Sequence, residues 1–119
     1  IPLAVEVRNA PLMASANTAL IEAEARYRRL LAEVEADVLE AEAQLESAGL
    51  GAALAVEREQ AAAERLTLLR RSFELGETSL VELLRAQSQT TEARIEGVRS
   101  RSRLSAAQAN LNQARGITP

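Results

Sequence analysis

The side chains that could do chemistry in this chain are carboxylates, guanidinium groups and hydroxyls. There are 17 acidic residues and 14 basic residues, every one of the latter an arginine, and there is neither histidine nor cysteine. Without an imidazole or a thiolate, Ser/His and Cys/His nucleophile pairs are excluded within this sequence, and the usual soft or imidazole metal ligands are absent. The glutamates stand close to arginines, as in "EAEAR" and "EREQ", which is typical of solvated ion pairs on helices. We therefore expect no catalytic site, no metal site and no cofactor.

Charge and hydropathy narrow the class of protein further. The net charge is -3 and the two signs are interspersed. Nucleic-acid binding is disfavoured because phosphate contacts need clustered positive charge, and the one basic run, "RSRSR" at 99–103, is typical of a solvated helix face. No segment approaches the roughly 20 apolar residues of a membrane helix, and no signal peptide opens the chain. A chain that starts at Ile1-Pro2 is expected to be a piece of a larger protein.

The composition predicts long helices rather than a compact core. Ala, Glu, Leu, Arg and Gln dominate, with one Phe, one Tyr and no Trp. Large apolar side chains supply most of the burial energy of a globular core, and this chain has few of them. The fold class we predict is all-α, a long antiparallel coiled-coil hairpin whose second arm is kinked.

The first part of the chain changes character near residue 10. In residues 1–10, Leu3, Val5 and Val7 alternate with other residues, which predicts the end of a strand and a linker. Asn9 is a candidate helix cap. From 11 to 48 the apolar residues follow the three-four spacing of a coiled-coil seam, with one stutter near Tyr27. These seam residues are Met13, Ala16, Leu20, Ala23, Tyr27, Leu31, Val34, Val38, Ala41, Leu45 and Ala48.

Two interruptions then divide the rest of the helical sequence. The first is "AGLGA", where Gly49 and Gly51 flank Leu50, and we interpret residues 49–51 as the tip of the hairpin. A second helix over 52–73 would return along a stripe formed by Ala62, Leu66, Leu69 and Phe73.

The second interruption, at 74–78, combines a stop signal with a start signal. Gly76 can end a helix, and Ser79 with Glu82 forms an S-x-x-E capping box for a third helix over 79–115. We interpret this segment as a joint in the ascending arm. The third helix is polar, with a sparse stripe of Ile95, Val98, Leu104 and Leu111, so it should need neighbouring helices or face water.

The segment from Arg70 onward resembles the TolC-type outer-membrane efflux channels. That family's repeats carry an aromatic residue, a glycine, a small hydroxyl residue, an acidic-Leu-Leu-x-Ala helix start and a closing L-x-x-A-x-G. Here these are Phe73, Gly76, Ser79, the run from Glu82 to Ala86, and the run from Leu111 to Gly116. The opening "IPLAVEVRN" is similar to the end of a barrel strand in the heavy-metal (CzcC/CusC-like) branch.

The resemblance implies a periplasmic segment of a trimeric channel in the outer membrane. Its β-barrel would lie outside these residues, and the helices would form part of an α-barrel tunnel. The implied partners are a membrane fusion (adaptor) protein and an RND-type pump, and the implied cargo is heavy-metal cations or drugs. On this interpretation Gly49, Leu50 and Gly51 contact the adaptor, and Phe73, Gly76, Ser79 and Glu82 form the equatorial joint. An adaptor's own coiled-coil hairpin, or a generic helical scaffold, is the alternative.

Overall fold

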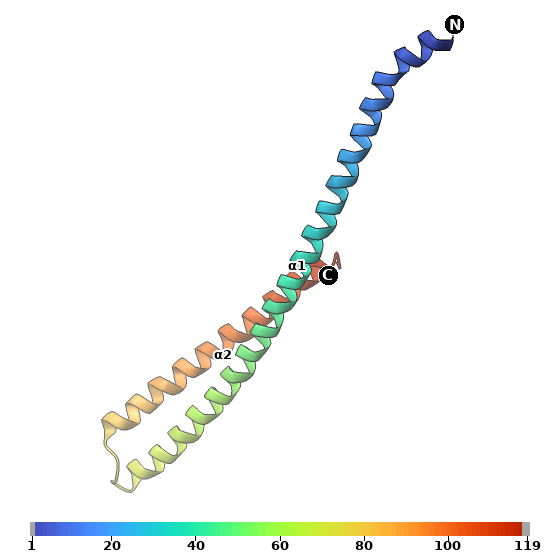
Figure 1. Ribbon diagram of the computed structural model, residues 1–119. Coiled ribbons are helices and arrows are strands. Elements are labelled where there is room, and N and C mark those ends of the chain that lie inside the picture. The colour runs from blue at the N-terminus through green and yellow to red at the C-terminus, as the bar shows by residue number, and fades with distance from the viewer. Residues whose placement is uncertain (1, 118–119) are drawn as a thin grey trace. The chain divides into compact units, whose positions relative to one another are not determined.

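The protein is built from two α-helices. The computed structural model describes the backbone of residues 2–117 and the side chains of residues 7–117. Helix α1 (Pro2–Glu74) and helix α2 (Leu80–Ala114) make up nearly all of that part, which contains no β-strand (Figure 1). The contacts divide the chain into two compact units, Ile1–Asp37 and Val38–Pro119. The predicted all-α fold class is confirmed. The joint predicted at 74–78 does interrupt the helical sequence, but as the full reversal between α1 and α2 rather than as a kink within one arm.

The first unit is a single stretch of helix, the beginning of α1. Every described side chain from residue 7 to residue 37 is exposed, including the apolar Leu20, Tyr27 and Leu31 that the spacing placed on a seam. The three-four pattern is present in the sequence, but in this unit no second helix covers it. Most of the stability of a helix in a protein comes from packing of its apolar face, so this unit is the less stabilised of the two.

The predicted strand at residues 1–10 is wrong wherever the structure describes it. α1 begins at Pro2 and runs through Leu3, Val5 and Val7 to beyond Pro11. A strand needs a partner to pair its backbone N–H and C=O groups, whereas a helix pairs them within the segment. Pro2 also suits the first helical position, since its missing N–H would have no intrahelical partner there. Asn9 is therefore inside the helix and does not cap it.

The second unit is an antiparallel hairpin, formed by the later part of α1 and by α2 (Figure 1). On α1 the covered residues recur every three or four positions from Val38 to Leu69 without a break. This spacing is that of a coiled-coil seam. The buried or half-buried members are Val38, Ala41, Leu45, Ala48, Ala52, Ala55, Glu59, Ala62, Leu66 and Leu69.

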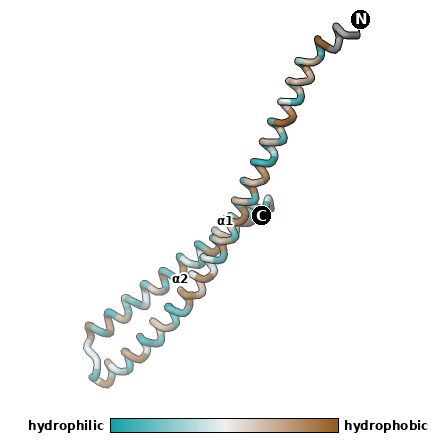
Figure 2. Tube along the Cα trace, viewed as in Figure 1, coloured by the Kyte–Doolittle hydropathy of each residue, from teal (hydrophilic) through white to brown (hydrophobic). Residues whose placement is uncertain are grey.

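α2 contributes a matching seam with the same regular spacing. It includes the buried residues Leu83, Ala86, Thr90, Gly97, Ser100, Ala107 and Leu111. Most of these side chains are small, so the two backbones can approach closely while each residue buries little area. Hydrophilic and hydrophobic residues alternate along both arms (Figure 2). Of the predicted sparse stripe on this helix, Leu104 and Leu111 lie in the seam, whereas Ile95 and Val98 are exposed on another face.

The predicted tip at residues 49–51 is wrong, because α1 continues through it. Gly49 and Gly51 have ordinary helical backbone, and the only glycines with positive φ in the described part are Gly76 and Gly116. A glycine costs a helix interior about 1 kcal/mol relative to alanine, and strong helix formers on both sides offset that cost. The seam also keeps its phase across the glycines, since Ala48 and Ala52 are four residues apart. The chain reverses instead at 75–79, between α1 and α2.

Gly97 lies in the middle of the seam, close to a side chain of the other arm. It is buried, and a Cβ at this position would lie 3.0 Å from Oε2 of Glu59 on α1. The obstacle is the end of a flexible side chain, whose other oxygen is 3.9 Å from Nε of Arg94. The glycine is therefore a packing point that a small shift of one carboxylate could relax.

Replacing Gly97 with Ala is expected to raise the free energy of unfolding by up to about 1 kcal/mol, because alanine is the better helix former. Gly97→Val is the matched control and should destabilise, since a branched side chain cannot be accommodated by moving Glu59 alone. Urea unfolding followed by circular dichroism measures both. A clear loss of stability in Gly97→Ala would mean that the Glu59 carboxylate is fixed in place.

Candidate functional site

The reversal at residues 75–79 begins with a specific helix end. Gly76 has a φ of 78°, and its N–H donates to the carbonyl of Phe73 at 2.9 Å. The Glu77 N–H donates to the carbonyl of Ser72, also at 2.9 Å. These two bonds constitute a Schellman motif, in which a glycine in the left-handed region satisfies the last carbonyls of a helix. The predicted role of Gly76 in ending a helix is confirmed.

The next helix starts at once on the other side of the reversal. Ser79 has extended backbone, and its Oγ accepts a hydrogen bond from the Glu82 N–H at 3.3 Å. Ser79 is thus the N-cap of α2, as the S-x-x-E pattern predicted. The reciprocal bond of a full capping box, from the Ser79 N–H to the Glu82 side chain, is not formed in the described structure. Glu82 still places a negative charge in the first turn, where the helix dipole favours it.

A hydrogen bond between two side chains connects the end of α1 with the loop of the reversal. The hydroxyl groups of Ser72 and Thr78 are hydrogen-bonded, and both side chains are half-buried. Ser72 therefore joins the loop twice, through its backbone carbonyl and through its hydroxyl. Together with the two caps, this bond gives the segment one defined shape.

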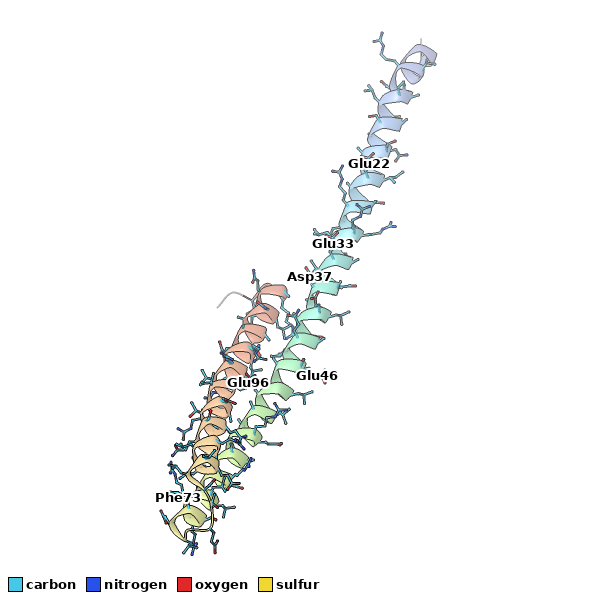
Figure 3. The ribbon with its side chains drawn as sticks, turned by 90° about the vertical axis from the view of Figure 1, so that its left-hand side faces the viewer. Glu22, Glu33, Asp37, Glu46, Phe73 and Glu96 are labelled. Carbon is cyan, nitrogen blue, oxygen red and sulfur yellow. The ribbon has the colours of Figure 1, made fainter. Side chains whose placement is uncertain are left out.

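Several exposed apolar side chains lie in or next to the reversal in the sequence. Leu75 is 68% exposed, and Phe73, Leu80, Val81 and Leu84 are also exposed. Figure 3 places Phe73 at this end of the hairpin. Exposed apolar residues that gather at one place, rather than scattering singly, are typical of contact surfaces. We call this group, with Glu77, the reversal surface.

The four residues predicted to form an equatorial joint therefore lie together, but at the turn of the hairpin. Phe73 and Gly76 end α1, while Ser79 and Glu82 start α2. Gly49, Leu50 and Gly51, predicted to contact an adaptor at the tip, lie inside α1, where Leu50 is 69% exposed. The stop and start signals were correctly recognised in the sequence, and the direction that the chain takes after them was not.

Polar contacts across the hairpin fix how the two arms lie. The Thr90 hydroxyl, which is buried, lies 3.2 Å from the Ala62 carbonyl on α1 and 2.9 Å from the Ala86 carbonyl on α2. Arg65 donates to the side-chain oxygen of Gln89 at 3.1 Å. Far from the reversal, Arg115 pairs with Glu42 at 2.6 Å, and the side chains remain nearly half-exposed. Sequence reasoning missed the three contacts between the arms, because each of them joins residues at least 24 positions apart.

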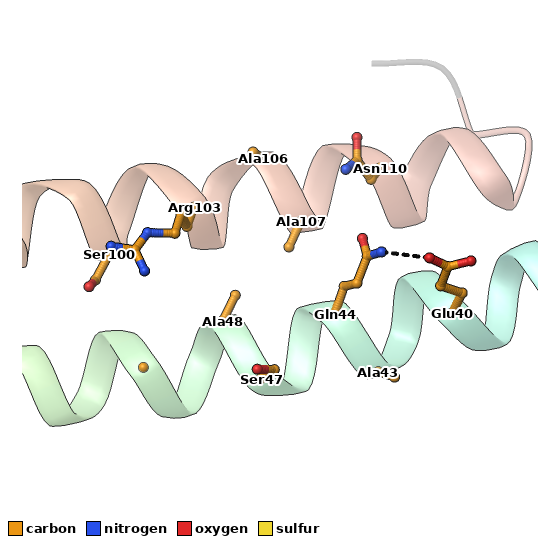
Figure 4. A pocket seen from close by; sticks show the side chains of 11 residues that line it. Glu40, Ala43, Gln44, Ser47, Ala48, Ser100, Arg103, Ala106, Ala107 and Asn110 are labelled. Carbon is orange, nitrogen blue, oxygen red and sulfur yellow. Dashed lines mark hydrogen bonds between the residues drawn. The ribbon is translucent and has the colours of Figure 1, made fainter.

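A groove lies between the arms in the half of the hairpin away from the reversal. Its volume is about 600 Å³, and its walls carry mainly small or polar side chains, among them Ser47, Ala48, Gly51, Ala107 and Asn110 (Figure 4). At one end Gln44 donates to Glu40 at 3.0 Å. The groove brings together no group of three acidic, histidine or cysteine residues, and the described part of the chain has no such group elsewhere.

Several charged residues form ion pairs on the helix surfaces. Glu22 with Arg26 and Glu24 with Arg28 are neighbours on one turn of α1, at 3.9 Å in each pair. Pairs of this kind contribute about 0.3–0.5 kcal/mol each.

Within residues 2–117, neither helix is apolar over a length that could cross a bilayer.

Comparison of the chain with protein-family models, with curated proteins and with solved structures finds no match.

Proposed function

We propose that this chain is a periplasmic hairpin of an outer-membrane efflux channel, acting with a membrane fusion protein and an RND-type pump. The observation that carries the proposal is that Phe73, Gly76, Ser79 and Glu82, on which the resemblance to the TolC-type family rests, together build the reversal. One short segment thus supplies both the family-like motif and the only turn between helices in the described chain.

Within this proposal, we move the partner contact from residues 49–51 to the turn between the helices. A helical hairpin presents its turn most openly, and the turn here is 75–79, not 49–51. The reversal surface offers apolar side chains around one acidic residue, and the caps hold the backbone in a single shape. A preformed surface loses little conformational entropy on binding, which favours docking of another protein. We assign the adaptor contact to this surface.

The remaining features support a passive duct rather than an independent domain. The seam is thin and most of the charge is solvated, so the hairpin suits a place among further helices, as in a homotrimeric α-barrel tunnel. The cargo in this proposal is heavy-metal cations or drugs, and this choice rests on the branch resemblance alone. The location is the periplasmic side of the outer membrane.

The test compares two leucines with nearly equal exposure in the full-length channel protein that contains this chain. Leu75 is 68% exposed at the reversal, and Leu50 is 69% exposed in the middle of α1. Leu75→Asp should weaken chemical cross-linking to the adaptor and lower resistance to zinc, copper and a cationic dye. Leu50→Asp should leave both near the wild-type level, with helix content unchanged in the two variants.

Unchanged adaptor cross-linking and unchanged export in Leu75→Asp would remove the reversal from the contact. If wild-type protein neither cross-links to an adaptor nor confers resistance to any of the three compounds, the channel proposal itself fails. A helical scaffold would then be the better description.

A further inference from the structure

A second groove lies between the arms, in the half of the hairpin near the reversal. Its volume is about 400 Å³, and both helices line it. α1 contributes Thr67 and Arg70, and α2 contributes Gln87, Thr91 and Arg94, beside residues of the seam. The groove described above has one arginine in its walls, whereas this one has two. We call it the arginine groove.

The two arginines belong to two rows of residues on one flank of the seam. Residues one heptad apart share a face of a coiled-coil helix. On α2 the row at steps of seven contains no acidic residue: Gln87, Arg94, Arg101, Gln108 and Arg115. The corresponding row of α1 consists of Glu42, Gly49, Val56, Ala63 and Arg70. Arg115 pairs with Glu42 across the seam, so the two rows face each other.

The positive charge on this flank has little acidic counterpart near the reversal. Glu42 is the only acid in the two rows, and its ion pair lies at the far end of the hairpin from the groove. Nε of Arg94 is 3.9 Å from Oε1 of Glu59, which is too long for a hydrogen bond. Among the described side chains Arg70 forms no ion pair, not even with Glu74 one turn further along α1.

The donors in the arginine groove are N–H groups rather than hydroxyls. The Thr67 hydroxyl donates to the Ala63 carbonyl at 3.0 Å, and the Thr91 hydroxyl donates to the Gln87 carbonyl at 3.1 Å. A hydroxyl has one proton, so these two cannot also donate to a ligand. The two guanidinium groups and the Gln87 side-chain amide supply N–H donors instead. Guanidinium donors match the oxygens of phosphate and carboxylate groups, so this site favours an anion.

We propose that the arginine groove binds a linear polyanion, which carries at least two phosphate or carboxylate groups. Arg94 lies beside Glu59, whereas Arg70 is eleven residues further along α1 than Glu59, about 16 Å of helix rise. The two arginines therefore line the groove at opposite ends. A compact anion with one charged group contacts one guanidinium, whereas a chain of anionic groups spans both.

The exposure of the site predicts weak, salt-dependent binding. The Arg94 side chain is 71% exposed, and charges in water are screened beyond about 10 Å at 0.1 M salt. We therefore expect a dissociation constant of about 0.1–1 mM at low ionic strength, which rises at least about fivefold in 0.3 M sodium chloride. The inference uses no residue of the reversal surface and is independent of the proposed channel role, so failure of adaptor binding would leave it standing.

NMR titration of the 119-residue chain with tripolyphosphate, in a low-salt buffer without divalent cations, tests the class of ligand. The N–H signals of the Arg70, Arg94 and Gln87 side chains should shift together and saturate. Orthophosphate should bind at least about fivefold more weakly, because it contacts one arginine at a time. Equal affinity for the two phosphates would overturn the proposal.

Citrate, titrated in parallel, distinguishes the two possible chemistries of the ligand. Saturable shifts with both compounds would assign the groove to polyanions in general, and shifts with tripolyphosphate alone would assign it to phosphate chains. Saturable shifts with neither compound would refute the site.

Single substitutions that each remove one positive charge test the location. Arg70→Gln and Arg94→Gln should each weaken tripolyphosphate binding at least about fivefold, and the double variant should show no saturable binding. The matched controls are Arg71→Gln on α1 and Arg99→Gln on α2, since both residues are exposed and outside the groove. The controls should stay within about twofold of wild type.

Equal losses in all four variants would show a general attraction to the arginines of the chain and would refute the groove. The net charge of -3 disfavours such an attraction, because the chain as a whole repels anions. Circular dichroism of each variant should show the helix content of wild type, since every substitution is at an exposed position and glutamine is a good helix former.

Discussion

Replacing Leu111 with Ala is expected to remove about 2–3 kcal/mol from the free energy of unfolding of the hairpin, a large part of the stability of so thin a structure. Leu111 is 4% exposed and lies in the seam near the end of α2. The buried apolar residues of the described chain are Ala41, Ala52, Ala55, Leu83, Ala86, Ala107 and Leu111. Only two of these are leucines, so each supplies a large share of the buried hydrocarbon.

The matched control for this prediction is Leu50→Ala. Leu50 is also a leucine inside a helix, but it is 69% exposed, so its removal creates no cavity. Alanine is at least as good a helix former as leucine, and we expect a change of less than about 0.5 kcal/mol. The two variants therefore remove the same atoms, and differ in whether those atoms are covered.

Urea unfolding and amide hydrogen exchange measure the difference. In Leu111→Ala, exchange should quicken on both arms of the hairpin, in residues 38–72 and 80–114, because the arms stabilise each other. Equal stability of the two variants would mean that the arms are not packed along the seam. Destabilisation by Leu50→Ala would mean that another chain covers Leu50 in solution.

Much of the fold could be predicted from local patterns. The helical composition, the three-four spacing of Val38, Ala41, Leu45 and Ala48, and the cap formed by Ser79 all depend on nearest neighbours along one helix. The structure reproduces each of these features. Such patterns state which residues are helical and which face of a helix is covered, but not which segment covers it.

The sequence analysis placed the turn of the hairpin at 49–51 instead of at the second interruption, and this prediction is wrong. The heptad spacing of the seam residues distinguishes the two positions. Across Gly49 and Gly51 the seam steps from Ala48 to Ala52 and on to Ala55 without a change of phase, as it would in one continuous helix. The two glycines around Leu50 were interpreted as the tip, and the segment with Gly76 was interpreted as a joint. Gly76 is followed after two residues by Ser79, which caps the next helix, whereas no capping residue follows Gly49 or Gly51 closely.

The contacts of the candidate site that sequence reasoning missed are those between the arms. Thr90 with the Ala62 carbonyl, and Arg115 with Glu42, depend on the register of the hairpin. With the turn assigned to 49–51, that register was wrong, and helix 52–73 was paired with the preceding residues instead of with α2. Once the reversal is set at 75–79, the two seams align and Gly97 falls opposite Glu59.

The placement of the turn makes a second prediction, in which two glycine substitutions change stability in opposite directions. Gly76→Ala should lower the free energy of unfolding of the hairpin by about 1–2 kcal/mol, because its φ of 78° is in the left-handed region, which alanine adopts only with strain. Gly49→Ala should raise it by about 0.5–1 kcal/mol, since Gly49 is in a helix interior.

Steric clashes do not explain the expected effect of either substitution. A Cβ added at Gly49 or at Gly76 would meet no atom within 4 Å. The two substitutions therefore add the same methyl group in open surroundings, and only the backbone conformation differs between them. Helix propensity and φ preference are then the only terms that separate the two variants.

Urea unfolding of the two variants and of wild type measures whether each substitution raises or lowers the free energy of unfolding. A turn at 75–79 requires Gly76→Ala to destabilise and Gly49→Ala to stabilise, because only Gly76 ends a helix. A turn at 49–51 would give the reverse order, since alanine would then disrupt the tip and strengthen a continuous helix at 76. The signs also bear on the proposed adaptor contact, because that proposal assigns the contact to the segment where the chain turns.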